Sequence, residues 1–425
     1  MTQRSSEIVE DLREEIVNLG RDLFDNPELG YKEFKTREIL GEYIRDIPLT
    51  DFKTYAITGF KATIGEGSPH IGLLFDMDAL PTKGHKNALN EDHAAHSCGH
   101  NAQMAVMVAA FKALARSKAL EKYGGRVSII GAPAEEFVDF DYRLDLIKDK
   151  KLKVFSGKQN LIADGAFDDV DLIIGGHGNS LEGHVIETGT ASNGFVAKTA
   201  VFKGVSAHSG AYPHRGKNAL NAALLALNAV ALLRETFQDD DHIRFHPIIK
   251  EGGDAVNTVP HRVVIETYIR GSSVVAIEDA NKRIDNAFIH SAKAMGCECE
   301  IETMPGYLPS NYFELLENYI SDSSREYISK DDIHKGGRTF ASDDIADVSS
   351  IVPVAHFGFS GFGGSFHGAD FYIKDEEMAY VTTAKIVTDA IENMLSNKEK
   401  LTNILEKFTP VMSKEEYITG WLNLD

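Results

Sequence analysis

Cys98 and His100, one residue apart in the run HSCGHN (96–101), carry the side chains best suited to metal chemistry in this sequence. At this spacing a thiolate and an imidazole can point the same way from an extended segment. Both are good ligands for a borderline-soft divalent ion such as zinc. An apolar run over 102–114 predicts a buried helix directly after them, whose positive end favours a thiolate. A buried thiol beside an ordinary histidine is the more frequent arrangement, so the assignment depends on other residues.

Further segments supply donors of the same kind. Glu135 and Glu136 are adjacent after an apolar run, so one carboxylate can bind a metal while the other faces a substrate and acts as general base. His177 lies in GGHG and His367 in SFHG, and each of these follows another apolar run. Taken singly, a solvated acidic turn and structural histidines are the simpler interpretations. The four segments predict a metal site only if the fold brings their side chains together.

The elements that would position these residues are short apolar strands that alternate with helices. The predicted strands cover 71–75, 127–131, 172–175 and 354–358. Nearly continuous apolar strands of this kind predict an α/β fold with a mostly parallel sheet covered on both faces. In such a sheet, ligands bind beyond the carboxyl ends of the strands. The polar residues just past these runs, which we expect to converge on one active site, are Asp76, Asp78, Glu135, Glu136 and His177.

The middle third of the chain predicts a second domain. Its expected strands cover 195–202, 242–249, 263–270 and 297–304, and its expected helices cover 218–236 and 276–295. The order β-α-β-β-α-β is the ferredoxin-like pattern. We therefore expect a domain over 190–305 inserted into a catalytic domain that is built from 1–189 and 306–425.

Composition limits the classes of function. The chain has 425 residues, enough for two or three domains, and a formal net charge of −20, which disfavours nucleic acid and anionic membranes as partners. The three cysteines are too few for a disulfide scaffold and suit a reducing compartment. No apolar signal segment or membrane-spanning stretch is expected. The sequence thus predicts a cytoplasmic protein.

Several motifs together resemble a known family over nearly the whole chain. They are NPELG (26–30), DMDALP (76–81), HSCGH (96–100), PAEE (133–136), AHSGAYPHRG (207–216) and GGDAVN (252–257). With these runs the chain resembles the dinuclear metallohydrolases of the aminoacylase and glutamate-carboxypeptidase superfamily. Within it, the chain is most similar to the amidohydrolase branch that includes aminobenzoyl-glutamate hydrolase and the auxin-conjugate hydrolases.

The resemblance implies roles for residues of the catalytic domain. Two divalent ions (zinc, manganese, cobalt or nickel) would be bound, with the Cys98 thiolate between them. Glu135 would be the catalytic base, and Asp78 would orient the ligands. The implied metal ligands are Cys98, His100, Glu136, His177 and His367.

The resemblance also implies roles in the inserted domain, which would act as a lid and commonly dimerises in this family. His208 resembles the lid histidine that reaches an active site, often that of the partner subunit. Asn257 and Arg270 resemble the groups that bind the substrate carbonyl and carboxylate. Without the resemblance, His208 is an ordinary loop histidine, and Arg270 is an arginine that could pair with a surface carboxylate.

Three positions depart from the pattern of many relatives. Asn101 stands where Asp is common, His177 lies in GGHG where Gly-Leu-His is common, and Phe24 replaces a frequent His. The first two resemble the aminobenzoyl-glutamate side of the branch. All three leave the identity of the substrate open.

The sequence thus predicts a metal-dependent, metallopeptidase-like amidohydrolase that cleaves N-acyl or N-aroyl amino acids, such as aminobenzoyl-glutamate conjugates. Its expected partners are this small substrate and a second copy of the chain, in a homodimer through the inserted domain. Two alternatives stay open. One is a dipeptidase or carboxypeptidase that acts on free peptides, and the other is a metal-binding protein of the same fold without turnover.

Overall fold

The computed structural model describes residues 4–89 and 91–424, which form two compact units. The large unit contains the chain up to Ala191, Asn311–Gly337 and the chain from Asp347 onward. The small unit contains Ser192–Ser310 and Arg338–Ala346, two stretches far apart in sequence. The domain limits expected at 190 and 305 remain a prediction.

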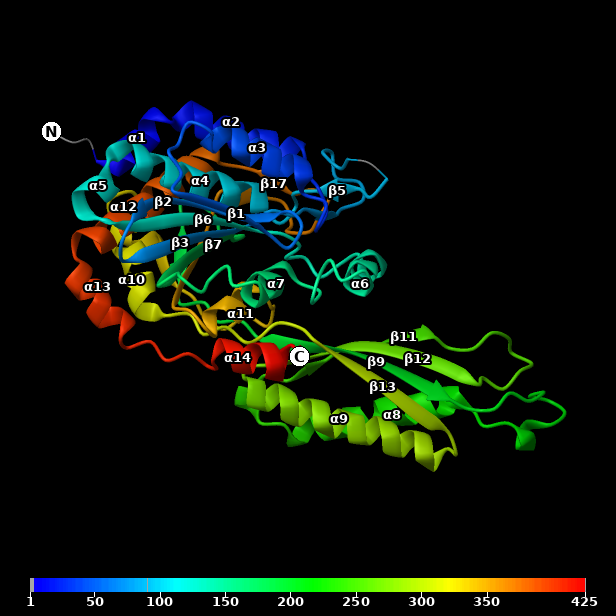
Figure 1. Cartoon of the computed structure of the whole chain (residues 1–425). Helices are drawn as coiled ribbons and strands as arrows, with labels where there is room; N and C mark the ends of the chain where they lie inside the picture. The colour runs from blue at the N-terminus through cyan, green and yellow to red at the C-terminus, as the bar shows by residue number, and fades with distance from the viewer. Residues whose placement is uncertain (1–3, 90, 425) are drawn as a thin grey trace. The chain divides into compact units, whose positions relative to one another are not determined.

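A large sheet with mostly parallel pairing forms the centre of the large unit (Figure 1). Its strands, in spatial order, are β1 (Asp51–Tyr55), β2 (Gly59–Glu66), β6 (Gly125–Ala132), β3 (His70–Asp76), β7 (Leu172–Gly178), β15 (Val354–Phe359), β8 (Ile186–Thr188) and β14 (Ile333–Lys335). Strands β6, β3, β7 and β15 run parallel to one another, as do β8 and β14. Strands β1 and β2 pair antiparallel at one edge, and so do β15 and β8. The carboxyl ends of the four central strands therefore lie along the same edge of the sheet, as predicted.

A layer of helices packs on this sheet and shares one apolar core with it. The helices of this layer are α1 (Ser5–Asp11), α2 (Arg13–Asp25), α4 (His100–Ser117), α10 (Glu314–Ser324) and α12 (Thr383–Ser396). Helix α4 contacts β3 and also α1, α2 and α12. Every residue of α4 from His100 to Leu114 is buried, which confirms the predicted buried helix.

The remaining elements of the chain outside the small unit are short. The helices are α3 (Phe34–Ile44), α5 (Ala119–Tyr123), α6 (Phe140–Lys148), α7 (Gly157–Ala163), α13 (Lys398–Leu405) and α14 (Lys414–Glu416). Helix α11 (Ile345–Ser349) has its first two residues in the small unit and the rest in the large unit. The strands are β4 (Leu80–Pro81), β5 (Ala94–Ala95), β16 (Phe362–Gly363) and β17 (Tyr372–Ile373). They form the two hairpin-like pairs β4–β5 and β16–β17.

The small unit is an antiparallel sheet with two helices on one face (Figure 1). Its elements are β9 (Gly194–Lys203), α8 (Ala219–Leu233), β10 (Arg244–Phe245), β11 (Ile248–Glu251), β12 (Arg262–Gly271), α9 (Val274–Ala294) and β13 (Glu298–Pro305). The spatial order is β10-β12-β9-β13, and β11 also pairs with β12. Phe202 of β9 packs on Phe288 of α9, with ring centroids 5.7 Å apart.

One predicted strand of the small unit is wrong in detail. The expected strand over 242–249 is divided into β10 and β11, with Pro247 between them. Proline has no backbone N–H to donate to β12, so the ladder is interrupted there. A register shift between Ile249 and Glu251 also interrupts the regular pairing of β11 with β12.

Helix α8 begins an apolar stretch that is long enough to span a membrane, although the sequence analysis expected no such stretch. The stretch Ala219–Thr236 has 18 residues and a mean hydropathy of 1.2, which meets the length and composition of a membrane span. A single helix of this kind is weak evidence, because helices of soluble proteins meet the same criteria. Its small side chains Ala219, Ala222, Ala223, Ala226 and Val230 are buried in the small unit.

Candidate active site

The large unit brings the predicted ligands together at the carboxyl edge of its sheet. Cys98 lies just before α4, and His100 is the first residue of that helix. His177 lies near the end of β7, and Glu136 follows β6. His367 follows β16 and has a φ of 62°. Residues that are far apart in sequence meet here because parallel strands end at the same edge.

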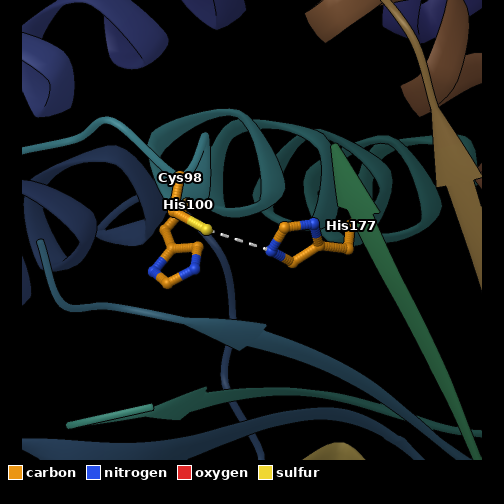
Figure 2. Close-up of side chains that lie close together, drawn as sticks. All are labelled: Cys98, His100 and His177. Carbon is orange, nitrogen blue, oxygen red and sulfur yellow. Dashed lines mark hydrogen bonds between the residues drawn. The ribbon is translucent and has the colours of Figure 1, made fainter. Parts of the chain in front are cut away.

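The Cys98 sulfur is the centre of this cluster. Its Sγ atom lies 3.4 Å from His177 Nε2 and 3.2 Å from His367 Nε2. Figure 2 shows Cys98, His100 and His177 with the sulfur directed toward the His177 ring. The rings of His100 and His177 are nearly perpendicular, with centroids 5.7 Å apart.

The donor atoms form overlapping groups that could each hold a metal ion. One group is Cys98, His100 and His177, and another is Cys98, Glu136 and His367. Within each group the donor atoms lie within 4.8 Å of one another. Cys98 belongs to both groups, which is the arrangement that a thiolate between two cations requires.

Asp78 organises the groups around it. Its carboxylate accepts hydrogen bonds from the backbone N–H groups of Glu135 and Glu136, both at 3.0 Å. His100 Nδ1 donates to the Asp78 carbonyl at 2.8 Å, and His177 Nδ1 donates to the Gly178 carbonyl at 2.8 Å. A carbonyl can only accept, so Nδ1 carries a proton in both rings, and Nε2 has a free lone pair whenever the ring is neutral. Both imidazoles thus have the tautomer that a metal ligand needs.

The pKa shifts of the buried donors favour a bound cation. Burial raises the pKa of the Cys98 thiol well above its usual range, and the Glu136 and Glu135 carboxylates raise it further. Burial also raises the pKa of Glu136. Burial alone would lower the pKa of His100, but its hydrogen bond to Asp78 and the charges of Asp76 and Asp78 raise it to about 9. A divalent ion would reverse these shifts by stabilising the deprotonated ligands.

One buried atom tests whether the donor set fits a metal ion. His100 Nε2 has no hydrogen-bond partner among residues 4–89 and 91–424. The Glu135 carboxylate oxygen Oε2 lies 3.9 Å from it, beyond hydrogen-bonding distance. An imidazole nitrogen buried without a partner is costly unless it binds something. The donor set therefore fits a divalent metal ion.

Glu135 is placed for a second role. Its side chain is 13% exposed, and it forms a third group of donors with His100 and Glu136. Its carboxylate lies close to the other donors and reaches solvent. This position suits a base that acts on water beside the cluster, although the same carboxylate could ligate an ion.

Asn101, one of the departures from the family pattern, does not face the donors. Its Nδ2 atom donates to the Gly20 carbonyl at 3.0 Å and to the Tyr380 hydroxyl at 3.1 Å. The amide thus joins α4 to neighbouring helical segments. Phe24, the third departure, packs edge-on against His85 with ring centroids 5.8 Å apart.

The remaining predicted residues belong to the small unit and occupy its two ends. His208 pairs with Thr258 in an isolated bridge, and the Ser209 N–H donates to the Asn257 carbonyl at 3.0 Å. These residues precede the first residue of β12, whereas Arg270 lies near its last. An extended strand of that length spans about 26 Å from Arg262 to Arg270. The structure therefore brings His208 and Asn257 together and separates both from Arg270.

The residues that hold the turn after β6 are not predicted by any sequence pattern. Glu33 Oε1 accepts a hydrogen bond from the Ala134 N–H at 2.9 Å. Arg143, which is fully buried, donates to the Glu136 carbonyl at 2.5 Å. A side chain at Gly30 would collide with Arg143 and Ala134, so only glycine fits there. The glycine of NPELG was the one local signal of this close approach.

A buried ion pair supports the neighbouring strand end and was also missed. Lys158 forms this pair with Asp76, the last residue of β3. Burial opposes the charge of Asp76, but the Lys158 ammonium lowers its pKa below the usual value. Lys158 precedes β7 by more than ten residues and has no periodic pattern that would predict its contact with Asp76.

Comparison with known proteins gives the family. Residues 72–393 match the profile of Peptidase family M20/M25/M40. The chain belongs to this family. The predicted enzyme class, a metallo-amidohydrolase, and the resemblance stated above are thereby confirmed.

Relatives and solved structures agree with this family. Xaa-Arg dipeptidase of Homo sapiens is 27% identical over 98% of this chain and 94% of its own length. A p-aminobenzoyl-glutamate hydrolase chain of Escherichia coli is 27% identical over 71% of this chain and 61% of its own length. A dinuclear metal-binding peptidase of Bacillus subtilis superposes with a TM-score of 0.68 at 18% identity, over 91% of this chain and 99% of its own. The predicted fold class is therefore confirmed for the large, mostly parallel sheet.

Proposed function

We propose that this chain hydrolyses the amide bond of N-acyl or N-aroyl amino acids, including conjugates of the aminobenzoyl-glutamate kind. Two divalent cations would be held by Cys98, His100 and His177 on one side and by Cys98, Glu136 and His367 on the other. The observation that carries the proposal is the membership of Cys98 in both groups. The donors suit zinc, manganese, cobalt or nickel. The relative that acts on p-aminobenzoyl-glutamate supports this class of substrate.

The reaction needs a base and an acid, and Glu135 can supply both. Cations bound at these donors supply Lewis acidity, which lowers the pKa of water and polarises a carbonyl group. Glu135 takes the proton of the water as the carbonyl carbon becomes tetrahedral. It then gives this proton to the amine nitrogen, since an amine leaves poorly without it. Asp78 fixes the backbone of Glu135 through its 3.0 Å hydrogen bond, which keeps the carboxylate in place.

The small unit would bind the rest of the substrate. Arg270 forms no ion pair with any carboxylate in the described part of the chain, and its Nη1 donates to the Ser342 hydroxyl at 2.7 Å. A guanidinium without a counterion is suited to the carboxylate of an amino acid. His208 would donate to the oxygen on which negative charge develops, and Asn257 would bind the same carbonyl group.

We propose a homodimer as the working form. His208 and Arg270 lie at opposite ends of β12, so one small unit does not bring both to a single site. A second copy of the chain would supply the missing group. Leu224, Leu225 and Leu232 of α8 are exposed, as are Ile248 and Ile249 of the edge strand β11. Such a helix face and strand edge support association through the small unit.

A second candidate is a dipeptidase, which the human Xaa-Arg dipeptidase favours because it matches nearly the whole chain. The same centre would cleave either substrate, since both contain an amide beside a carboxylate. The location remains the cytoplasm in this proposal. The three cysteines are free thiols, which supports a reducing compartment.

The test is hydrolysis by the purified, metal-loaded chain of N-acetyl, N-benzoyl and 4-aminobenzoyl amino acids beside free dipeptides. We expect cleavage of the acylated or aroylated compounds that a chelator abolishes and a divalent ion restores. Glu135→Gln should keep its fold and metal content and lose at least about 100-fold in kcat, because an amide cannot accept the proton.

Glu42→Gln is the matched control, since Glu42 is exposed on α3. It should retain the activity of the unchanged chain. Cleavage of free dipeptides alone would favour the dipeptidase. Full activity of Glu135→Gln would contradict the assignment of the base.

A further inference from the structure

Two arginines of the small unit stand directly opposite each other on neighbouring strands. In the antiparallel pair β10–β12, Arg244 is the partner of Arg270. Side chains at directly opposed positions share a face of the sheet and have Cβ atoms about 5 Å apart. A side chain at Gly271, the next residue, would meet Ile277 of α9. Arg270 and Arg244 therefore lie on the face away from the helices.

The groups around the two guanidiniums are neutral. Arg270 Nε donates to His246 Nε2 at 3.3 Å, and its guanidinium lies 5.2 Å from the ring centroid of Phe195. Arg244 lies over the Phe340 ring at 4.3 Å. Burial and the charge of Arg270 lower the pKa of His246, so this ring stays neutral and accepts the hydrogen bond. Aromatic faces and neutral acceptors hold both guanidiniums in place without cancelling their charge.

Neither guanidinium forms an ion pair within residues 4–89 and 91–424, although the chain has a net charge of −20. Arg262, on the same strand, does pair with Glu251, and Arg283 of α9 pairs with Asp279. Like charges at directly opposed positions repel each other and destabilise a strand pair. An anion between them would remove this cost, and a carboxylate matches the fork of each guanidinium.

We infer that the amino-acid half of the substrate is dicarboxylic, as in glutamate or aspartate conjugates. Arg270 would bind the α-carboxylate and Arg244 the side-chain carboxylate. This inference rests on the proposed function, in which Arg270 takes the carboxylate beside the scissile amide. The guanidiniums of Arg244 and Arg270 would repel the side chain of a C-terminal arginine or lysine. The site thus distinguishes an acidic conjugate from an Xaa-Arg dipeptide by the sign of one charge.

The test compares 4-aminobenzoyl-L-glutamate with 4-aminobenzoyl-L-glutamine, which differ only in the side-chain carboxylate, and adds 4-aminobenzoyl-L-arginine. The metal-loaded full chain should have a higher kcat/KM for the glutamate compound than for the other two. Arg244→Gln should lower the glutamate-to-glutamine ratio of kcat/KM by about 10- to 100-fold, the usual weight of a hydrogen-bonded charge pair. Arg244→Glu should shift the preference toward the arginine compound.

Arg262→Gln is the control, because it removes a guanidinium from the same strand outside this pair; its ratio should equal that of the unchanged chain. Arg244→Lys keeps the charge and should lower the ratio less than Arg244→Gln does. A ratio near one in the unchanged chain, or an unaltered ratio in Arg244→Gln, would overturn the inference and leave the proposed function standing. Failure to cleave any acylated or aroylated amino acid would overturn the proposed function itself.

Discussion

The Cys98 sulfur lies between two histidines that come from distant parts of the chain. His177 precedes the small unit in sequence and His367 follows it, yet both Nε2 atoms lie within 3.4 Å of Sγ. The sulfur is buried and surrounded by carboxylates that raise the pKa of its thiol. Without a cation, the thiol therefore keeps its proton at neutral pH. Because the Cys98 sulfur belongs to both groups of donors, replacing Cys98 would remove one donor from each group.

Cys98→Ala should remove at least one metal ion per chain, because it deletes a ligand of both groups. Elemental analysis of the purified and dialysed variant measures this loss. Cys299→Ala is the matched control, since it removes a thiol from β13 of the small unit and should keep the metal content of the unchanged chain. Equal metal content in Cys98→Ala and in the control would refute the ligand role.

At the scale of elements, the turn after β6 is held from several sides. Asp78 accepts hydrogen bonds from the N–H groups of Glu135 and Glu136, and Glu33 accepts one from Ala134. Arg143 donates to the Glu136 carbonyl. The turn contains Ala134 in a left-handed conformation, with a φ of 54°, which costs free energy that these contacts offset. The turn thus presents the carboxylates of Glu135 and Glu136 in a fixed geometry.

Glu33 makes the stability of this turn depend on pH. Burial and the charge of Asp78 raise the pKa of Glu33 from 4.5 to about 8. A carboxyl group with a raised pKa binds its proton more tightly when the protein is folded. Its contribution to stability is therefore complete below about 4.5 and is lost as the pH rises through about 8. The free energy of unfolding of the metal-free chain should fall across this window.

Glu33→Gln should flatten that pH dependence, because the amide does not titrate and its oxygen can still accept from Ala134. Urea unfolding at a series of pH values measures the effect. Glu38→Gln, an exposed change on α3, should keep the slope of the unchanged chain. An equal slope in Glu33→Gln would show that Glu33 does not titrate in this window.

At the scale of the whole molecule, His208 and Arg270 of the small unit lie at opposite ends of β12. A homodimer would combine His208 of one copy with Arg270 of the other. His208→Ala and Arg270→Ala should then each lose most activity when pure. Mixed and reassembled together, they should regain about a quarter of the activity of the unchanged chain, because half of the dimers are mixed and each has one complete site.

Size-exclusion chromatography with light scattering gives the oligomeric state of each preparation in this experiment. A mixture of tagged and untagged unchanged chain measures how completely the subunits exchange. A mixture of the two variants that stays inactive after exchange would indicate that each subunit supplies its own groups.

The sequence predicted the parts of this molecule that follow from local pattern. Glu136, His177 and His367 could be found because each follows an apolar strand, and parallel strands end at one edge. Cys98 and His100 could be found because an apolar helix follows them. The contacts of Glu33, Arg143 and Lys158 could not be found, because a single charged residue gives no periodic signal of burial. The division of the strand over 242–249 was missed although Pro247 was visible, since the apolar residues on both sides continued the alternation. The opposition of Arg244 and Arg270 depends on register, which the sequence alone does not supply.

The shared sulfur has a consequence for the order in which the proposed centre fills. The first cation to arrive must displace the thiol proton, whose release is unfavourable in this buried, acidic surrounding. The second cation then meets a thiolate that is already formed and releases no proton from it. Loading of the two positions would therefore be coupled through a single ionisation, whose cost is met by whichever cation binds the sulfur first.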